Sequence, residues 1–314
     1  MGPAPTRRVA IALGVVVTFL WATSVVLIRV GLTEEDVQPL GFAGVRFTLA
    51  ALLLLPLAVP QLRSVPAWTA GRRPLLGVVV YGLLMFCIAQ VGFYVALGEL
   101  SAATVGLLMG FAPVVTALVT VRDRHERADA LQVIGIGVLI VGVVVYFGLG
   151  LPETGASLAL LAGISIPIVV GGSARLGRHL AVDVRRTFGG PLGLTALAMT
   201  AGGVTTLMLA LVLEGVPAFS PRAWLLIVWL AAVNTALTYT MWTQIQRTLR
   251  AVESSVLADL TVILVAVLGW VVLDESLGPL EVAGLLLAVA GVLLVQLSPA
   301  LRGRRSVVGP PPQP

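Results

Sequence analysis

One acidic residue, Asp259, lies inside an otherwise apolar segment, the stretch "SSVLADLTVILVAVLGWVVLDE" from Ser254 to Glu275. A charge in a hydrocarbon core costs at least a few kcal/mol, so this carboxyl should face a protein interior or a wet cavity. Asp259 could exchange protons or pair with a cationic group of a ligand. The alternative is a neutral aspartic acid that hydrogen-bonds a neighbouring helix and holds the bundle together.

A second charge, Arg46 in "GFAGVRFTLAA", lies about 10 Å into another apolar run at the usual helical rise. Its guanidinium could attract a carboxylate or another anion. Alternatively, the side chain snorkels to the headgroups or ties down a helix end. We do not expect Arg46 to pair directly with Asp259, because the two segments enter from opposite faces.

Polar and aromatic residues recur at a spacing of four in two further apolar runs. Gln90 and Tyr94 share one helix face, and Asn234, Thr238 and Trp242 share another. An aromatic floor with a few amides and hydroxyls would suit a small amphipathic ligand in a cavity. The alternative for each residue is interhelical hydrogen bonding or packing, worth roughly 0.6 kcal/mol per bond.

The usual equipment of several enzyme classes is missing from the chain. All 20 basic residues are arginine, so no lysine is present to complete a Walker A loop. His125 and His179 fall in arginine-rich stretches, and Cys87 is the single cysteine, which predicts no zinc site and no disulfide. We therefore predict no cofactor, no metal and no enzymatic activity. No long basic run with interleaved aromatics indicates nucleic acid.

Composition predicts one polytopic membrane protein of the all-α class. The 314 residues are 58% hydrophobic and 11% charged, less than half of the charge of a typical soluble domain. Ten apolar runs are long enough to cross a core of roughly 30 Å. They lie near residues 9–28, 39–59, 75–97, 102–121, 130–149, 157–174, 190–213, 224–244, 251–273 and 280–297.

The arginines predict the direction in which these runs cross the membrane. If the N-terminus is cytoplasmic, 17 of the 20 arginines fall on the cytoplasmic side, as the positive-inside rule requires. We expect a plasma membrane of the bacterial inner-membrane type, with both termini cytoplasmic. Glu126 and Glu275 precede the fifth and tenth runs, where each carboxylate is expected to meet the positive end of the helix that follows.

The chain contains an internal repeat. A shift of 149 residues aligns "LQVIGIGVLIVGVVVY" with "LEVAGLLLAVAGVLLV" and pairs Gly135 with Gly284 and Gly142 with Gly291. Because each half has five runs, the second half must enter the membrane from the opposite side. Inverted repeats of this kind are typical of secondary transporters, whose substrate site lies near the midplane between the halves.

The repeat resembles the EamA family of the drug/metabolite transporter superfamily over essentially Ala10 to Leu297. The resemblance rests on "LWATSVVLIRVGL", "GVRFTLAALLLLPLA", "SAATVGLLMGFAPVVTALVTV" and "VVLDESLGPLEVAGLLLAVAGVLL". It implies ten helices in two inverted five-helix repeats, a central cavity, and export of amino acids, other metabolites or drugs. By their positions in the family, Trp21 and Ser24 join the substrate-binding candidates. The resemblance favours a structural role for Arg46, because family members often have an arginine at this position.

The chain departs from that family at several positions. Helix one carries Trp21–Ala22 where tryptophan–glycine is common. Pro113 fits the expected proline of helix four, but its repeat counterpart in helix nine is Val262, and Pro167 lies in helix six. Both prolines remove a backbone hydrogen bond within a span, so each could form a static kink or a gating hinge.

The sequence therefore predicts a cytoplasmic tail (1–8), two EamA repeats (9–150 and 151–298) and a disordered cytoplasmic tail (299–314). We expect a secondary transporter that exports a small metabolite or drug by alternating access, with proton coupling at Asp259 as one option. Its partners are a small-molecule substrate and the lipid bilayer, and a monomer is favoured although the oligomeric state is open. The alternatives are an integral-membrane enzyme acting on lipid and a membrane scaffold or sensor.

Overall fold

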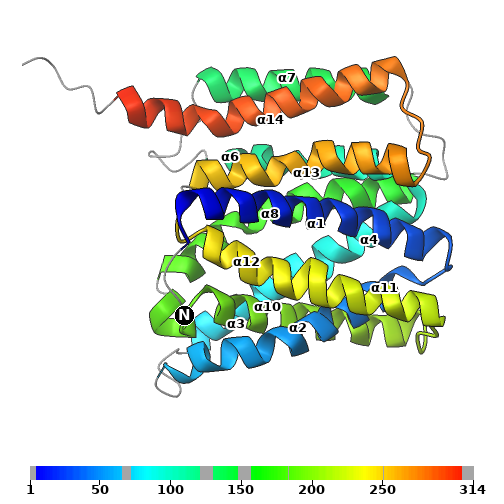
Figure 1. Cartoon of the computed structure of the whole chain (residues 1–314), viewed down its shortest axis with the longest axis vertical. Coiled ribbons are helices and arrows are strands. Elements are labelled where there is room, and N and C mark those ends of the chain that lie inside the picture. Colours follow the sequence, from blue (N-terminus) through cyan, green and yellow to red (C-terminus); the bar gives the residue numbers. More distant parts are fainter. Residues whose placement is uncertain are drawn as a thin grey trace, which may run out of the picture.

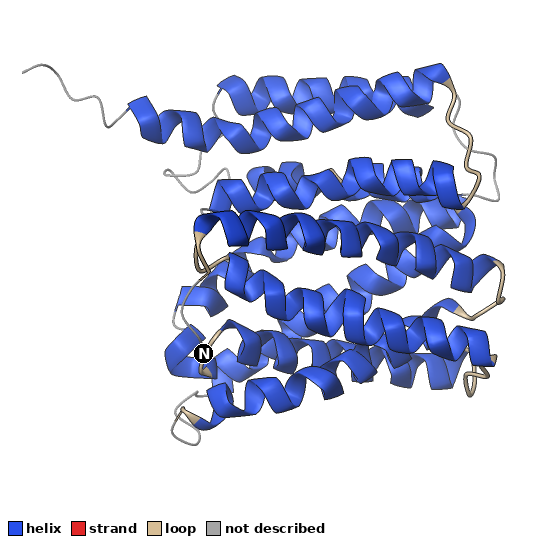
Figure 2. Ribbon diagram, viewed as in Figure 1, coloured by secondary structure: helices blue, strands red, loops and turns tan. Residues whose placement is uncertain are grey.

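Helices make up the elements of this computed structural model, and no strand occurs within the described ranges (Figure 2). The structure describes residues 5–65, 72–120, 130–147, 157–182, 184–249 and 251–305. The elements are α1 (Arg7–Thr33), α2 (Pro39–Arg63), α3 (Arg72–Leu83), η1 (Leu84–Ile88), α4 (Ala89–Glu99), α5 (Ala102–Met109), α6 (Ala112–Thr120), α7 (Ala130–Phe147), α8 (Ser157–Val182), α9 (Val184–Phe188), α10 (Pro191–Leu213), α11 (Pro221–Ala231), η3 (Ala232–Leu237), α12 (Thr238–Ile245), α13 (Ala251–Val272) and α14 (Pro279–Arg305).

Most of the long helices run roughly side by side, as Figure 1 shows. Within the described residues, seven helices are long and apolar enough to cross a membrane: Arg7–Thr33, Pro39–Arg63, Arg73–Glu99, Ala130–Phe147, Leu158–Val182, Pro191–Leu213 and Pro221–Ile245. Three shorter apolar helices, Ala102–Thr116, Leu260–Val272 and Pro279–Val295, fall on the remaining predicted runs. The predicted all-α, multi-pass membrane protein is confirmed. Helix α14 continues to Arg305, so residues 299–305 of the predicted tail are helical.

Helices α7 and α14 form a pair that lies at one edge of the bundle (Figure 1). Gly135 faces the backbone of Gly291, and Gly142 faces that of Gly284, so the order is reversed and the two helices are antiparallel. A Cβ atom built at Gly142 would lie only 2.4 Å from the backbone nitrogen of Ala288. Small residues let backbones approach where lipid supplies no hydrophobic drive between helices. Each of these glycines of α7 faces the repeat counterpart of the other one. This pattern is that of a contact around a two-fold axis.

Helices α2 and α10 form a second antiparallel pair. Gly44 faces the backbone of Leu207, and Gly203 faces that of Thr48. At one end, Glu214 beyond α10 accepts hydrogen bonds from the first backbone N–H groups of α2 (2.7 and 2.9 Å). At the other end, Gln61 of α2 accepts one from Gly193 in the first turn of α10 (3.3 Å). Each helix thus satisfies free N–H groups at the start of the other.

Two π-helical turns interrupt the third and eighth predicted runs at matching positions. The turn η1 separates α3 from α4, and η3 separates α11 from α12. Under the 149-residue shift, their bounds agree to within one residue. Such wide turns are rare and occur frequently at functional sites. Their repetition extends the internal symmetry from the sequence to the backbone.

The fourth predicted run is broken in two, between α5 and α6 at Gly110 and Phe111. Pro113 follows directly and cannot donate the hydrogen bond that would continue the helix. Its side chain lies outside the described residues. Pro167 is buried within α8, which stays helical throughout. Whether either proline acts as a hinge stays a prediction.

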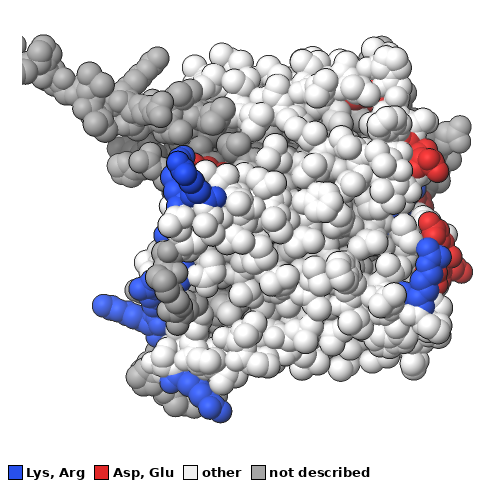
Figure 3. Space-filling view, viewed as in Figure 1, with Lys and Arg blue, Asp and Glu red and all other residues white. Residues whose placement is uncertain are grey.

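Charged residues gather at the two ends of the bundle and leave its flank uncharged (Figure 3). In that view, the Lys and Arg class, here all arginine, predominates at the end near the N-terminus, and the acidic residues lie mainly at the opposite end. Many aliphatic side chains of the described residues are exposed, such as Leu225, Val212 and Leu161. This distribution suits a helix bundle whose flank contacts lipid.

The α7–α14 crossing can be tested with two alanine substitutions on the same helix. We expect Gly142→Ala to lower the thermal unfolding temperature of the purified protein, because the new methyl group meets backbone atoms at a cost of about 1–3 kcal/mol. Gly137→Ala is the matched control, since a Cβ there meets nothing within 4 Å. Equal melting temperatures for the two variants would contradict the close crossing.

Candidate functional site

Arg46 lies at the centre of a buried polar cluster rather than at a headgroup surface. It is 5% exposed and belongs to α2. Its Nη2 donates to Ser24 Oγ of α1 (2.9 Å), its Nη1 to Tyr94 Oη of α4 (3.0 Å), and its Nε to Thr235 Oγ1 of η3 (3.1 Å). One guanidinium therefore joins four helical elements from both halves of the chain. Snorkelling to the headgroups does not occur in this structure.

The charge of Arg46 has no acidic partner among the described residues. All three acceptors are neutral hydroxyls, and the ring of Phe47 lies 5.1 Å from the guanidinium carbon. Removing a cation from water without a counter-charge costs several kcal/mol, which hydroxyl groups offset only in part. A charged side chain of this kind inside a membrane span is by default a candidate for a functional site. The arrangement can bind an anion, and above all a carboxylate, which matches the guanidinium fork.

Asn234 lies beside this cluster on η3 and faces α1. Its Nδ2 donates to the backbone oxygen of Leu20 and to Thr23 Oγ1 (3.1 Å). The Thr238 hydroxyl donates to the backbone oxygens of Asn234 and Thr235 in the same helical run. Asn234 thus links α1 to the π-helical turn, at a position next to the Arg46 contacts.

A chain of aromatic rings borders the polar cluster. Starting beside Arg46, successive ring centroids are 5.7 Å apart for Phe47 and Phe86 and 5.9 Å for Phe86 and Tyr239. They are then 6.4 Å apart for Tyr239 and Trp21 and 4.9 Å for Trp21 and Trp242. Such spacings are those of tilted and edge-to-face aromatic contacts. The rings offer an apolar surface that begins at the buried cation.

The structure brings most of the predicted substrate-binding residues together. Ser24 and Tyr94 contact Arg46, Asn234 and Thr238 lie on η3 and α12 beside it, and Trp21 and Trp242 belong to the aromatic chain. Gln90 is only partly buried and makes no side-chain hydrogen bond with the described residues. Asp259 lies in α13, but its side chain is outside the described residues.

Sequence reasoning missed Thr235, Phe86 and the central position of Arg46. Thr235 and Phe86 occupy equivalent positions in the two repeats, one in each π-helical turn. The 149-residue shift could have identified this pair, but hydropathy gives no sign of a π-helical turn. The partners of Arg46 come from segments far apart in the chain, so only the folded structure shows that they meet.

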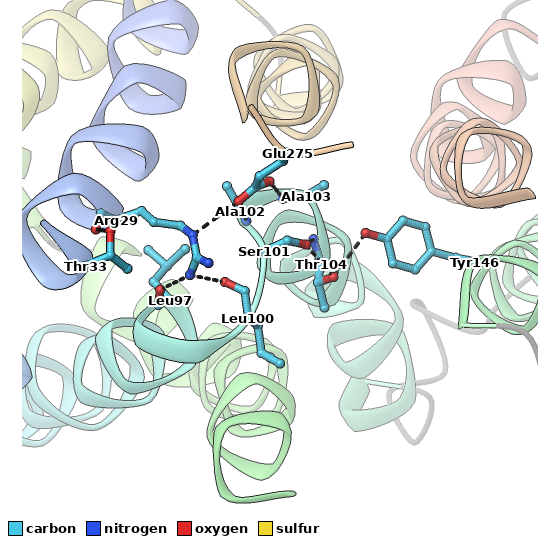
Figure 4. A network of polar contacts seen from close by, with 10 residues as sticks. All are labelled: Arg29, Thr33, Leu97, Leu100, Ser101, Ala102, Ala103, Thr104, Tyr146 and Glu275. Carbon is cyan, nitrogen blue, oxygen red and sulfur yellow. Dashed lines mark hydrogen bonds and ion pairs between the residues drawn. The ribbon is translucent and has the colours of Figure 1, made fainter. Parts of the chain in front are cut away.

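A second charged cluster ties α1, α4 and α5 to the loop before α14, as Figure 4 shows. Glu275 accepts from the backbone N–H of Ala102 (2.8 Å) and pairs with Arg29 Nε (3.2 Å). Arg29 also donates to the backbone oxygens of Leu97 and Leu100 at the end of α4. From α5, Thr104 Oγ1 continues the network to Tyr146 Oη of α7 (3.0 Å).

The prediction that Glu275 meets the positive end of the helix that follows it, α14, is therefore wrong. Glu275 meets the N-terminus of α5, while Glu281 accepts a hydrogen bond from Gly278 before α14 (2.7 Å). The physical reason is that three residues lie between Glu275 and the start of α14 at Pro279, and the carboxylate instead reaches the first backbone N–H groups of α5, those of Ala102 and Ala103 (2.8 and 3.5 Å). Glu126, its repeat counterpart, lies outside the described residues.

A small apolar crevice lies apart from both clusters, between the α7–α14 pair and the rest of the bundle. It is lined by Leu107, Gly110, Leu139, Val262, Ala288, Val289 and Val292. The lining residues that the structure describes include no charged side chain that could orient a polar ligand. The polar cluster around Arg46 is instead closely packed, with Tyr94 and Thr238 fully buried.

These features define a multi-pass membrane protein of the transporter class. The chain belongs to the EamA-like transporter family, whose sequence pattern matches residues 8–148 and 154–297 and thus both halves. It is 25% identical over 273 residues to the uncharacterized transporter YyaM of Bacillus subtilis, covering 82% of this chain and 84% of that protein. The predicted membership of this family is confirmed.

Two further similarities are more limited. The chain is 28% identical over 143 residues to the aromatic amino acid exporter YddG of Escherichia coli, covering 44% of this chain and 45% of that protein. One solved crystal structure has the same fold, with a TM-score of 0.62 and 18% identity, over 93% of this chain and 99% of that one.

A pair of arginine-to-methionine variants separates a binding role for Arg46 from a structural one. We expect Arg46→Met to unfold thermally within a few degrees of the wild type, because no buried carboxylate loses its partner. Arg29→Met should be destabilised by about 3 kcal/mol, because it leaves Glu275 buried without its cation. A larger loss for Arg46→Met than for Arg29→Met would assign Arg46 to the structural framework.

Proposed function

We propose that this protein is a secondary transporter that exports a small organic anion by alternating access. The observation that carries the proposal is the buried guanidinium of Arg46, which has only neutral hydroxyl partners among the described residues and lies where the two halves meet. An anionic substrate would supply the missing counter-charge. The rings of Trp21, Trp242, Tyr239 and Phe86 would contact its apolar part.

We propose ten spans in two inverted five-helix repeats as the framework for this activity. The seven long apolar helices and the three shorter ones together make ten. The antiparallel pairs α2–α10 and α7–α14 and the matching turns η1 and η3 support a two-fold relation between the halves. An axis that relates antiparallel helices lies in the membrane plane and places the shared site near the midplane.

The substrate class that fits best is an amino acid or related carboxylate with an aromatic or apolar side chain. Arginine binds carboxylates through parallel N–H groups, which fixes the orientation of the ligand. The aromatic chain then begins at the same place. The similarity to a protein named as an aromatic amino acid exporter agrees with this class and with outward movement.

The polar cluster is closed in the present conformation, so transport requires the ends of the bundle to open in turn. The tie between Arg29 and Glu275 closes one end, together with Arg222, which pairs with Glu34 and Glu35 (3.1 and 3.2 Å). The partly buried Arg29–Glu275 pair joins elements of both repeats. We infer that this pair separates when the site opens toward that end.

We propose the plasma membrane as the location, with both termini in the cytoplasm and the Arg29–Glu275 tie on the outer side. The gathering of arginines at the end near the N-terminus supports this orientation (Figure 3). A monomer suffices for the mechanism, because the site is formed within one chain. We propose that a proton enters in exchange for the substrate and that Asp259 of α13 carries it, because an acid within a membrane span is a candidate for proton transfer.

The role of Arg46 can be measured by counterflow in proteoliposomes with labelled L-phenylalanine and 3-phenylpropanoate. We expect Arg46→Met to lower the initial rate at least roughly tenfold, since the carboxylate loses its charged partner. Arg46→Lys should keep part of the activity, because a point charge replaces the fork. Phenethylamine, which lacks the carboxylate, should compete with neither probe. An Arg46→Met variant as fast as the wild type would overturn the anion site.

Proton coupling can be tested with a pH gradient across the same vesicles. We expect Asp259→Asn to remove the dependence of the transport rate on the gradient while exchange at equal pH continues, because the amide cannot release a proton. Glu253→Gln is the control, since Glu253 lies in the first turn of the same helix and pairs with Arg7 at the surface. Retention of the gradient dependence in Asp259→Asn would remove this residue from coupling.

A further inference from the structure

The amide of Asn234 is fixed in one orientation. The residue is 1% exposed, and its Nδ2 faces the backbone oxygen of Leu20 and the hydroxyl of Thr23. Because a carbonyl oxygen carries no hydrogen, the atom that faces Leu20 must be the donor nitrogen. The amide oxygen therefore points elsewhere.

The Oδ1 atom of Asn234 is buried and receives no hydrogen bond from the described residues. An unpaired acceptor in a buried environment costs about 1–3 kcal/mol. Buried polar side-chain atoms in folded proteins nearly always have a partner. This oxygen can accept a hydrogen bond at no cost to any contact that the structure already has.

The amide of Asn234 and the guanidinium of Arg46 lie beside each other where α1 meets η3. Asn234 contacts Thr23, and the next residue on each element, Thr235 and Ser24, contacts Arg46. The three hydrogen bonds of Arg46 occupy one N–H on each of its nitrogens, and a guanidinium has five N–H groups. One N–H therefore remains on each terminal nitrogen. The terminal nitrogens of Arg46, which can donate to an anion, are thus close to Asn234 Oδ1, which can accept from an N–H group.

The fold does not require an amide at this position. The repeat counterpart of Asn234 is Met85 in η1, where a π-helical turn also forms. Ser173 of α8 donates to the sulfur of Met85 (3.3 Å), so the same turn is packed there without an amide. The wide turn accounts for the backbone, and the amide of Asn234 adds a polar group that its counterpart lacks.

We propose that Asn234 recognises an N–H donor that the substrate carries next to its carboxylate, as an α-amino acid does. This inference rests on the proposed anion transport through Arg46. The carboxylate takes the terminal nitrogens of Arg46, and the ammonium group donates to Asn234 Oδ1. The amide oxygen thus selects α-amino acids over carboxylic acids of the same shape.

Two ligands that differ in the amino group test this selection. We expect the wild-type protein in nanodiscs to bind L-phenylalanine at least roughly tenfold more tightly than 3-phenylpropanoate, because a site built for a donor rejects the analogue without it. Asn234→Met should abolish the preference and keep 3-phenylpropanoate affinity within about twofold, since that ligand never used the amide oxygen. Retained binding also shows that the variant is folded. Met85→Leu, at the repeat counterpart, should leave the preference unchanged.

A second variant keeps an acceptor at the same place. We expect Asn234→Asp to retain the preference for L-phenylalanine, and to bind 3-phenylpropanoate more weakly than the wild type because two carboxylates then approach each other. An equal affinity of the wild type for both ligands, or an equal loss of both in Asn234→Met, would overturn the role of Asn234. Counterflow distinguishes the two levels: if wild-type vesicles exchange both ligands without preference, only the amide inference fails. If they exchange neither, the proposed transport fails with it.

Discussion

Close approach between helix backbones is the constraint on which this structure depends. Between helices in lipid, burial of apolar surface provides little drive for association, so packing distance and hydrogen bonding decide which helices pair. The α7–α14 pair satisfies this constraint with glycines that face each other across the crossing. The α2–α10 pair does so with Gly44 and Gly203, and Glu214 and Gln61 bond the free N–H groups at the opposite helix starts. Both pairs join one half of the chain to the other.

The symmetric backbone carries an asymmetric set of side chains. Equivalent π-helical turns hold Asn234 and Thr235 in one half and Met85 and Phe86 in the other. Near one turn, Arg46 binds Ser24, Tyr94 and Thr235. Near the other, Gly82 leaves room for the backbone of Ala198 in α10. The polar face of the site therefore draws Arg46, Ser24 and Tyr94 from the first half and Thr235 from the second, while the π-helical turn of the first half supplies the ring of Phe86.

Arg46, which is buried, and Arg29, which is partly buried, have different electrostatic surroundings. Arg29 has a carboxylate partner, Glu275, and two backbone oxygens, so its charge is balanced within the protein. Arg46 has neutral partners among the described residues and lies where four elements converge. A balanced pair suits a contact that holds the end of the bundle together. A cation without a partner suits a ligand that brings the opposite charge.

The sequence alone predicted the class of protein, the duplication and most members of the candidate site. Hydropathy predicts the helices because lipid forces each span to satisfy its own backbone, and the spacing of Asn234, Thr238 and Trp242 predicts a shared face because helical periodicity is local. Only the tertiary structure decided that Arg46 is the centre of the cluster and that Glu275 meets α5 instead of α14. The reason is that these contacts join residues from distant parts of the chain. Local hydropathy and periodicity describe each helix by itself, whereas the burial of a charge and its partners are set by how the helices pack.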